Sequence, residues 1–325
     1  MSPNESSNRD KQSLHYIVRS GLAGGFAGCV AKTAVAPLDR VKILFQASNP
    51  EFQKYAGRWS GVFRAGADIY RDAGVRGLMQ GHSATLLRIF PYAAIKFMAY
   101  DQIEHILMPR REDQTNGRRF LAGSLSGITS VFCTYPLDLI RVRMAVHTKS
   151  SKTSLSSKPP TFRQSFSEIY HERALPTAAP VEALSSKTLF DRIPILKFYR
   201  GFTVTVVGMV PYAGISFLCW GYLRAKLIPP DRRASTLQDL GFGAISGAIA
   251  QTSSYPFEIV RRRMQVGGLR HPERWAGWRE TVQAVYQTGG LRGFYVGLSI
   301  GYLKIVPMTA ISYALWQWGK RVLDV

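Results

Sequence analysis

The sequence predicts an all-α membrane protein, in which six transmembrane helices form three pseudo-threefold repeats and three short amphipathic helices lie on one membrane surface. Three observations predict this fold. A six-residue motif occurs three times, long apolar segments occur in pairs, and a shorter amphipathic segment separates the members of each pair. Such internal repetition determines how every other element is interpreted.

The repeated motif is a proline followed by an acidic residue two positions later and a basic residue five positions later. Its copies read Pro37-Leu38-Asp39-Arg40-Val41-Lys42, Pro136-Leu137-Asp138-Leu139-Ile140-Arg141 and Pro256-Phe257-Glu258-Ile259-Val260-Arg261. With 17 prolines, 21 acidic residues and 42 basic residues among 325, random placement would give about 0.14 copies, so three copies are a specific signal.

Glycines recur at fixed positions before each motif. They lie 13 and nine positions before the proline, in the pairs Gly24 and Gly28, Gly123 and Gly127, and Gly243 and Gly247. A Gly-xxx-Gly face allows helix backbones to approach closely in a membrane. We therefore expect close helix packing at these pairs.

The apolar segments are long enough to cross a membrane. They cover residues 14–45, 84–107, 120–146, 202–228, 237–266 and 298–323. Each contains at least 24 residues, which at about 1.5 Å per residue crosses roughly 30 Å of hydrocarbon. Lys32, Arg88, Lys96 and Lys304 interrupt them. Because charges at that depth usually face a protein interior or water, we expect the helices to surround a wet cavity.

Three shorter segments have apolar residues at helical spacing and read as amphipathic helices on the membrane surface. They cover residues 59–74, 162–174 and 278–290. The predicted organisation is a polar tail at 1–13 and three repeats at 14–112, 113–230 and 231–325. The second repeat contains inserted loops at about 148–160 and 175–194, which explain why its motif lies 120 residues from the next rather than 99.

The composition narrows the function. The net charge is +21, yet 46% of residues are hydrophobic and 19% are charged. Basic residues therefore lie between apolar segments, which favours a membrane protein that handles an anion over a nucleic-acid binder. The cysteines Cys29, Cys133 and Cys219 lack disulfide or metal spacing. No motif typical of an enzyme active site occurs, so we expect no enzyme activity, metal or cofactor.

The motif and its surroundings resemble the mitochondrial carrier family over residues 14–323. The resemblance implies alternating access around a central cavity, with the amphipathic helices on the matrix side. It also implies a multi-pass protein of the mitochondrial inner membrane, acting as a monomer and bound to lipid such as cardiolipin. A peroxisomal membrane is the alternative location.

In that family the motif residues form a matrix gate. Prolines inside helices produce kinks, here at Pro37, Pro136 and Pro256. The resemblance pairs Asp39 with Arg141, Asp138 with Arg261, and Glu258 with Lys42 in a ring between helices. Local pairs within each helix are the alternative, because residues three apart share one helix face.

Two further gate features follow from the resemblance. Gln46 and Gln265 match glutamines that brace the ring, whereas Ala145 occupies the third brace position. The cytosolic gate is weaker, because only Asp101 and Arg224 match its expected ion pair. A partly wet pair contributes under about 1 kcal/mol, so we expect this gate to open readily.

Substrate choice should depend on positions where the repeats differ. Three residues before a proline in the second, fourth and sixth spans lie Arg88, Gly208 and Lys304. Two cations facing one cavity suit a phosphate-bearing anion, and Gly208 followed by Met209 leaves a flat slot for a purine. In the family these positions, with Lys32, contact substrate. The alternatives are cations that snorkel to an interface, a glycine required by helix packing, and a methionine that fills the core.

The opening segment from Lys32 to Ala47 looks most like that of the coenzyme A carriers, including the Graves-disease-carrier-like proteins. The predicted function is therefore alternating-access transport of coenzyme A or a related adenosine 3′-phosphate, with adenine nucleotides as candidate exchange partners. The first alternative is an ATP, ADP or AMP carrier. A soluble basic protein and a membrane adaptor that no longer transports are further alternatives.

Overall fold

The structure is a computed structural model. It describes residues 14–57, 59–110, 114–148, 160–172, 194–228, 235–270 and 277–322. Helices dominate these ranges, which contain no β-strand. The predicted tail at 1–13 and nearly all of the predicted loops at 148–160 and 175–194 lie outside the described residues.

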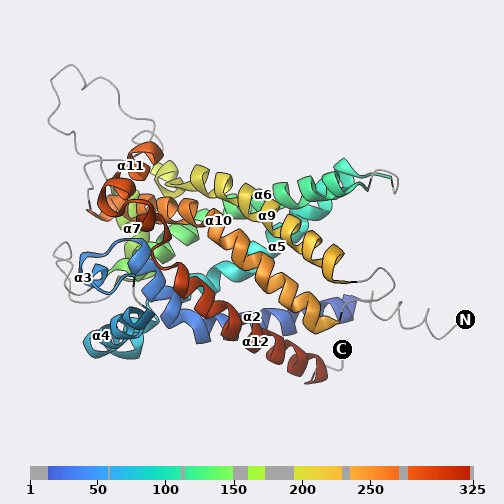
Figure 1. The fold of residues 1–325 in the computed structure, drawn as a ribbon, viewed down its shortest axis with the longest axis horizontal. Coiled ribbons are helices and arrows are strands. Elements are labelled where there is room, and N and C mark those ends of the chain that lie inside the picture. Colours follow the sequence, from blue (N-terminus) through green and yellow to red (C-terminus); the bar gives the residue numbers. More distant parts are fainter. Residues whose placement is uncertain are drawn as a thin grey trace, which may run out of the picture.

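Six long helices run through the described part of the chain, and each matches a predicted span. They are α2 (Leu14–Gln46), α5 (His82–Leu107), α6 (Asn116–Val146), α9 (Phe202–Leu227), α10 (Thr236–Arg270) and α12 (Leu298–Val322). The start of α2 and the end of α12 lie at the same end of the bundle (Figure 1). The predicted all-α fold with paired long helices is confirmed.

Length and hydropathy alone identify fewer spans than the repeats do. In the described ranges, three helical stretches are long and apolar enough to cross a membrane: Gly117–Val146, Pro194–Leu227 and Leu291–Gly319. The remaining long helices contain charged side chains such as Lys32 in α2 and Arg88 in α5. A charge lowers the mean hydropathy of a span even where it faces the bundle interior.

Every long helix contains a proline at a repeated place. Pro37, Pro136 and Pro256 lie inside α2, α6 and α10, and Pro91, Pro211 and Pro307 lie inside α5, α9 and α12. Glycines in the left-handed conformation precede the latter three helices: Gly81, Gly201 and Gly297, with φ of 83°, 84° and 82°. A Cβ at Gly81 would lie 2.9 Å from the Arg141 carbonyl oxygen, so its conformation and its neighbour both favour glycine.

Shorter helices gather at the end of the bundle opposite to the start of α2 (Figure 1). They are α3 (Pro50–Gln53), α4 (Trp59–Leu78), α7 (Phe162–His171) and α11 (Trp278–Gly289), with the 3₁₀ helices η3 (Pro194–Tyr199) and η4 (Leu291–Tyr295). The predicted amphipathic helices correspond to α4, α7 and α11. Gly74, the predicted end of the first, adopts non-helical φ 63° and ψ −160° within α4.

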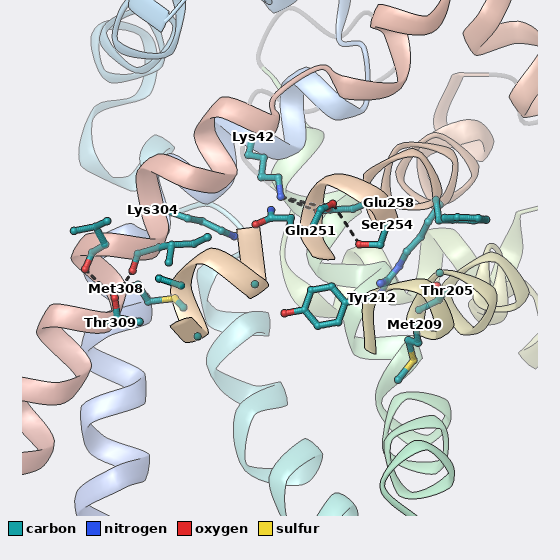
Figure 2. Close-up of a pocket in the computed structure, with 18 of the residues that line it drawn as sticks. Lys42, Thr205, Met209, Tyr212, Gln251, Ser254, Glu258, Lys304, Met308 and Thr309 are labelled. Atoms are coloured by element: carbon teal, nitrogen blue, oxygen red, sulfur yellow. Dashed lines mark hydrogen bonds and ion pairs between the residues drawn. The ribbon is translucent and has the colours of Figure 1, made fainter. Parts of the chain in front are cut away.

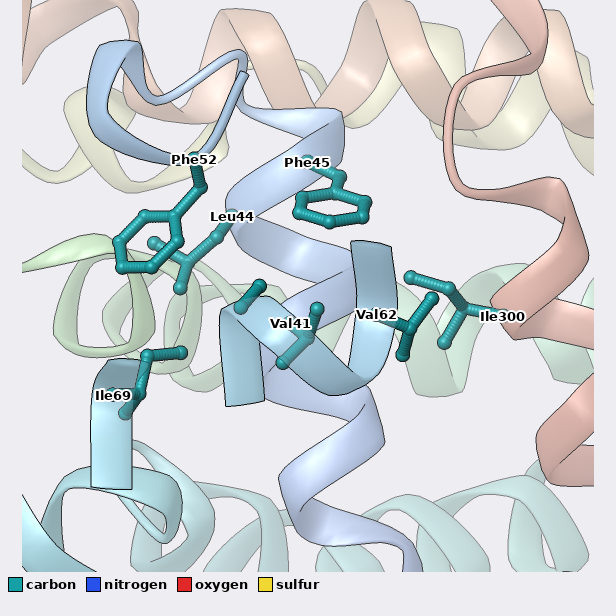
Figure 3. Packing of buried hydrophobic residues seen from close by; sticks show 8 residues of the cluster. Val41, Leu44, Phe45, Phe52, Val62, Ile69 and Ile300 are labelled. Atoms are coloured by element: carbon teal, nitrogen blue, oxygen red, sulfur yellow. The ribbon is translucent and has the colours of Figure 1, made fainter. Parts of the chain in front are cut away.

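A buried apolar cluster fixes α4 against the bundle. Val41, Leu44 and Phe45 of α2 pack with Val62 of α4 and Ile300 of α12 (Figure 3). Burying an aliphatic or aromatic side chain of this size contributes about 1.5–3 kcal/mol. One side of α4 is therefore buried in this cluster, and the packing holds α2 close to α12.

The most extensive helix contacts join α5 to α6, α9 to α10, and α12 to α2. The last of these closes the bundle by joining the two ends of the chain. The predicted close packing is seen at Gly127, where a Cβ would lie 3.3 Å from the Met209 Cε, and Gly24 has an ordinary contact with Trp316, but close packing is absent at the other four glycines of these pairs. A Cβ added at Gly28, Gly123, Gly243 or Gly247 would meet no atom within 4 Å. On α10, the reason is that both glycines line a cavity rather than a helix contact.

Candidate functional site

Three ion pairs join α2, α6 and α10 just beyond their prolines. Arg141 Nη2 lies 3.2 Å from Asp39 Oδ2, Arg261 Nη2 lies 2.5 Å from Asp138 Oδ2, and Lys42 Nζ lies 2.9 Å from Glu258 Oε1. We call these six side chains the ring. Each pair links different helices, so the structure forms the between-helix arrangement rather than local pairs within a helix.

Two of the three predicted substrate cations contact the ring. Arg88 Nη1 donates to Asp138 Oδ1 at 2.7 Å, and Lys304 Nζ donates to Asp39 Oδ1 at 2.8 Å. Both side chains remain about one-fifth exposed, so they point into the bundle without being sealed in it. Neither side chain extends to a membrane interface, which was the alternative interpretation of these two cations.

The carboxylates of the ring carry unequal numbers of cations. Asp138 accepts from Arg262 as well, at 3.3 Å, whereas Glu258 forms its ion pair in the described ranges with Lys42 alone. Gly208 occupies the place on α9 that corresponds to the cations on α5 and α12, so no side chain reaches Glu258 from there. Aligning the repeats shows that Gly208 stands where the other repeats have a cation, but it does not show which way those cations point. The sequence therefore did not predict that cations outside the ring contact its carboxylates.

The two predicted bracing glutamines contact tyrosines that precede the motif prolines. Gln46 Nε2 lies 3.1 Å from the Tyr255 hydroxyl, and Gln265 Nε2 lies 3.2 Å from the Tyr135 hydroxyl. Gln265 also donates to Asp138 Oδ2 at 3.1 Å. Ala145 cannot make such a bond, so the third side of the ring lacks a glutamine.

An apolar layer continues the closure beyond the ring. Buried side chains from α2, α6 and α10, with Ala47 just past the end of α2, pack together toward the short helices: Ile43, Ala47, Val142, Ala145, Val146 and Val266. Ions and water cross such a layer only at a high cost in lost hydration. The ring and this apolar layer together block the path at the end where α4, α7 and α11 lie.

A cavity of about 1200 Å³ lies on the other side of the ring, among α9, α10 and α12. Lys42, Glu258 and Lys304 contribute to its lining beside Met209 and Tyr212. In Figure 2, Lys304 and Tyr212 extend toward one another across this space. The cavity therefore has a charged floor, formed by Lys42, Glu258 and Lys304, and a wall that carries few charges.

Among the predicted substrate residues, Gly208, Met209 and Lys304 line this cavity. Arg88 lies at the ring, and Lys32 is half-buried, where its charge attracts that of Asp39. Gly208 also has a packing reason, because a Cβ there would lie 2.8 Å from the Phe257 Cβ. Phe257 therefore fills the space beside Gly208, which supports the packing interpretation of this glycine rather than an open slot.

The predicted cytosolic pair is not formed. Asp101 and Arg224 are exposed in the described part of the bundle, and the Arg224 guanidinium instead lies 5.0 Å from the centre of the Trp220 ring. The ion pairs of this conformation therefore concentrate at the ring, and the opposite end lacks the expected contact.

Known proteins match this chain over nearly its whole length. The family model described as "Mitochondrial carrier protein" matches residues 14–111, 112–177 and 232–324. "Mitochondrial carrier protein LEU5" of Saccharomyces cerevisiae is 43% identical, over 96% of this chain and 92% of its own. "Solute carrier family 25 member 16" of Bos taurus is 38% identical (94% and 89%), and "Mitochondrial carrier protein CoAc2" of Zea mays is 36% identical (96% and 88%).

Proposed function

This chain belongs to the mitochondrial carrier family, and on that premise we propose that it transports coenzyme A, or a closely related adenosine 3′-phosphate, by alternating access. It is a multi-pass transporter of the mitochondrial inner membrane. The family and its relatives support a small anionic substrate. The identity of that anion is the proposal.

The observation that carries the proposal is the excess of cations at the ring, which lies at one end of the cavity. In the described part of the bundle, the positive side chains at the ring outnumber the carboxylates that they contact. The positive side chains in excess repel one another unless a further anion lies between them. The 3′-phosphate and pyrophosphate of coenzyme A carry about four negative charges near neutral pH, which suits this excess.

The cations that contact the ring also suggest how binding promotes transport. Lys304 and Arg88 donate to Asp39 and Asp138, which belong to the proposed matrix gate. Phosphate oxygens are strong acceptors for both kinds of cation. A substrate that draws Lys304 away from Asp39 weakens the hold on the gate. Its binding then favours the conformation in which the matrix side is open.

The rest of the cavity suits a long molecule with an adenine ring. Its volume of about 1200 Å³ exceeds the roughly 300–1000 Å³ of most small-ligand pockets. Met209 and Phe257, which line the cavity beside Gly208, offer an apolar surface for adenine, and the wall along α10 offers space at Gly243 and Gly247 for the pantetheine arm. The similarity to CoAc2 agrees with this substrate.

The remaining expectations are part of the same proposal. The protein acts as a transporter without enzyme activity, as a monomer, in contact with cardiolipin. An adenine-nucleotide carrier for ATP, ADP or AMP is the second candidate, since the apolar surface at Met209 and Phe257 suits any adenine ring. A further alternative is an exchange in which adenine nucleotides are the counter-substrates of coenzyme A.

Uptake by liposomes containing the purified protein tests the substrate. Labelled coenzyme A, dephospho-coenzyme A and ADP are offered separately, with liposomes containing no protein and liposomes preloaded with ADP as controls. We expect coenzyme A to enter fastest and to compete with the other two compounds. Entry of ADP with no entry of, or competition by, coenzyme A would reject the coenzyme A assignment and favour the nucleotide carrier.

A further inference from the structure

The three junctions between α2, α6 and α10 are not equivalent. A glutamine–tyrosine hydrogen bond links α2 to α10 and another links α10 to α6. At the junction of α2 with α6, the corresponding positions are Ala36 and Ala145. Both alanines line a small cavity of about 10 Å³ at that junction. This side of the ring therefore needs another polar contact if it is to be held as firmly as the other two.

Arg40 supplies such a contact. Its side chain is 4% exposed, and it crosses from α2 to the end of α6. Nε donates to the Ala145 carbonyl oxygen at 3.2 Å, and Nη2 donates to the His147 carbonyl oxygen at 3.0 Å. Asn49 adds a longer bond to the Val146 carbonyl oxygen, at 3.4 Å.

These acceptors are available because α6 ends at Val146. The last carbonyls of a helix have no partner within it and carry partial negative charge, which favours a cation. The positions that correspond to Arg40 in the other two repeats are the buried apolar residues Leu139 and Ile259. The cation at this position thus occurs on α2, the helix that meets α6 at the junction without a glutamine brace.

We propose that Arg40 is a positioning residue that takes the place of the missing glutamine brace and latches α2 to the end of α6 while the matrix gate is closed. This inference rests on the proposed function of the ring as that gate. Opening the gate separates α2 from α6, so the guanidinium loses both acceptors until water reaches it. Leaving a buried charged donor unpaired is unfavourable, and the latch therefore favours the closed conformation.

The alternative is that Arg40 merely caps α6 and stabilises the fold in every conformation. A measurement of gate opening separates the two roles. Val266 is 2% exposed within the apolar layer beyond the ring. In a variant whose three cysteines are replaced by serine, Val266→Cys would become accessible to a membrane-impermeant maleimide from the matrix side only when the gate opens.

We expect Arg40→Ala to raise the labelling rate of this cysteine about tenfold, which corresponds to about 1.4 kcal/mol. Gln46→Ala, which removes the brace between α2 and α10, should raise it to a similar extent. Lys226→Ala is the matched loss of charge, because Lys226 is exposed at the far end of α9. This control should leave the labelling rate unchanged.

A folded Arg40→Ala protein that labels as slowly as the Lys226→Ala control would overturn the proposal, even if its melting temperature falls. If Arg40→Ala does not fold, Arg40→Gln replaces it, since its shorter amide can reach only one of the two carbonyls. Faster labelling of that variant supports the latch, and unchanged labelling overturns it. The assay contains no substrate, so a failure of coenzyme A transport would leave this result intact.

Discussion

Arg88 of α5 donates to Asp138 of α6 at 2.7 Å, so a cation expected to contact substrate is bound to a carboxylate of the ring. The same carboxylate accepts from Arg261 and Arg262. Binding and gating residues therefore share one hydrogen-bonded cluster. A substrate phosphate that contacts Arg88 necessarily competes with Asp138, which gives binding a direct effect on the ring.

Arg88→Ala should reduce substrate uptake by at least about tenfold, because hydrogen bonds to charged groups contribute roughly 1.5–3 kcal/mol. The protein should remain folded in the membrane, since Asp138 keeps Arg261 and Arg262. Initial uptake rates in liposomes, normalised to reconstituted protein, measure the effect. Lys226→Ala is the control, and an Arg88→Ala protein that transports at the wild-type rate would refute the substrate role.

Charge reversal tests the ring pairs, and the structure ranks them. Asp39→Asn alone should make transport slow or leaky. Asp39→Lys with Arg141→Asp should recover some activity, but the new lysine would lie beside Lys304 and be repelled. Lys42→Glu with Glu258→Lys should recover more, because no cation on α9 reaches Glu258.

Uptake by each double variant is compared with that of its two single variants. Recovery in neither double variant would count against the predicted partners. If uptake recovers more when Asp39 and Arg141 are exchanged than when Lys42 and Glu258 are exchanged, the carboxylates of the ring do not differ in the way that their contacts indicate.

Gly208→Ala should destabilise the protein by about 1–3 kcal/mol, the usual cost of overpacking. Its Cβ would lie 2.8 Å from the Phe257 Cβ, and neither backbone can move without disturbing the contact between α9 and α10. Gly214→Ala on the same helix is the control, because a Cβ there meets no atom within 4 Å. Melting temperatures in detergent should fall for the first variant only. Equal melting temperatures would show that Gly208 is not required for packing.

Glu172→Gln should be the most destabilising single change outside the bundle interior. Glu172 accepts from Arg143 at 2.7 Å and from Arg200 at 3.5 Å, with all three side chains more than nine-tenths buried. Removing one member of a buried charged cluster costs about 3–5 kcal/mol. Glu168→Gln changes an exposed acid on α7 and serves as the control. A thermal unfolding curve that is the same for both variants would contradict this account.

The repeated motif was sufficient to predict much of the fold. It placed the six long helices and the three amphipathic helices, because these features depend on spacing along one repeat. The partners within the ring came from the resemblance to the carrier family, because spacing alone also allowed local pairs within each helix. Hydropathy alone identified three spans, since Lys32 and Arg88 interrupt helices that nonetheless pack in the bundle. Threefold repetition supplied the information that hydropathy lacked.

Features that depend on contacts between repeats were harder to predict. The sequence showed that Arg88 and Lys304 share a register, but not that each reaches a carboxylate on a neighbouring helix. The glycine spacing suggested close packing, yet Gly243 and Gly247 line the cavity. Arg40 carried one signal that was not used: a cation where the other two repeats have buried aliphatic residues.

The unequal ring has a consequence for motion. When the junction of α2 with α10 separates, Glu258 gives up one cation, whereas at the junction of α6 with α10 Asp138 gives up both Arg261 and Arg262. The first separation is therefore the easier of the two, and we expect one repeat to move ahead of its neighbours. A protein built from three similar repeats would then pass between its two conformations through asymmetric intermediates.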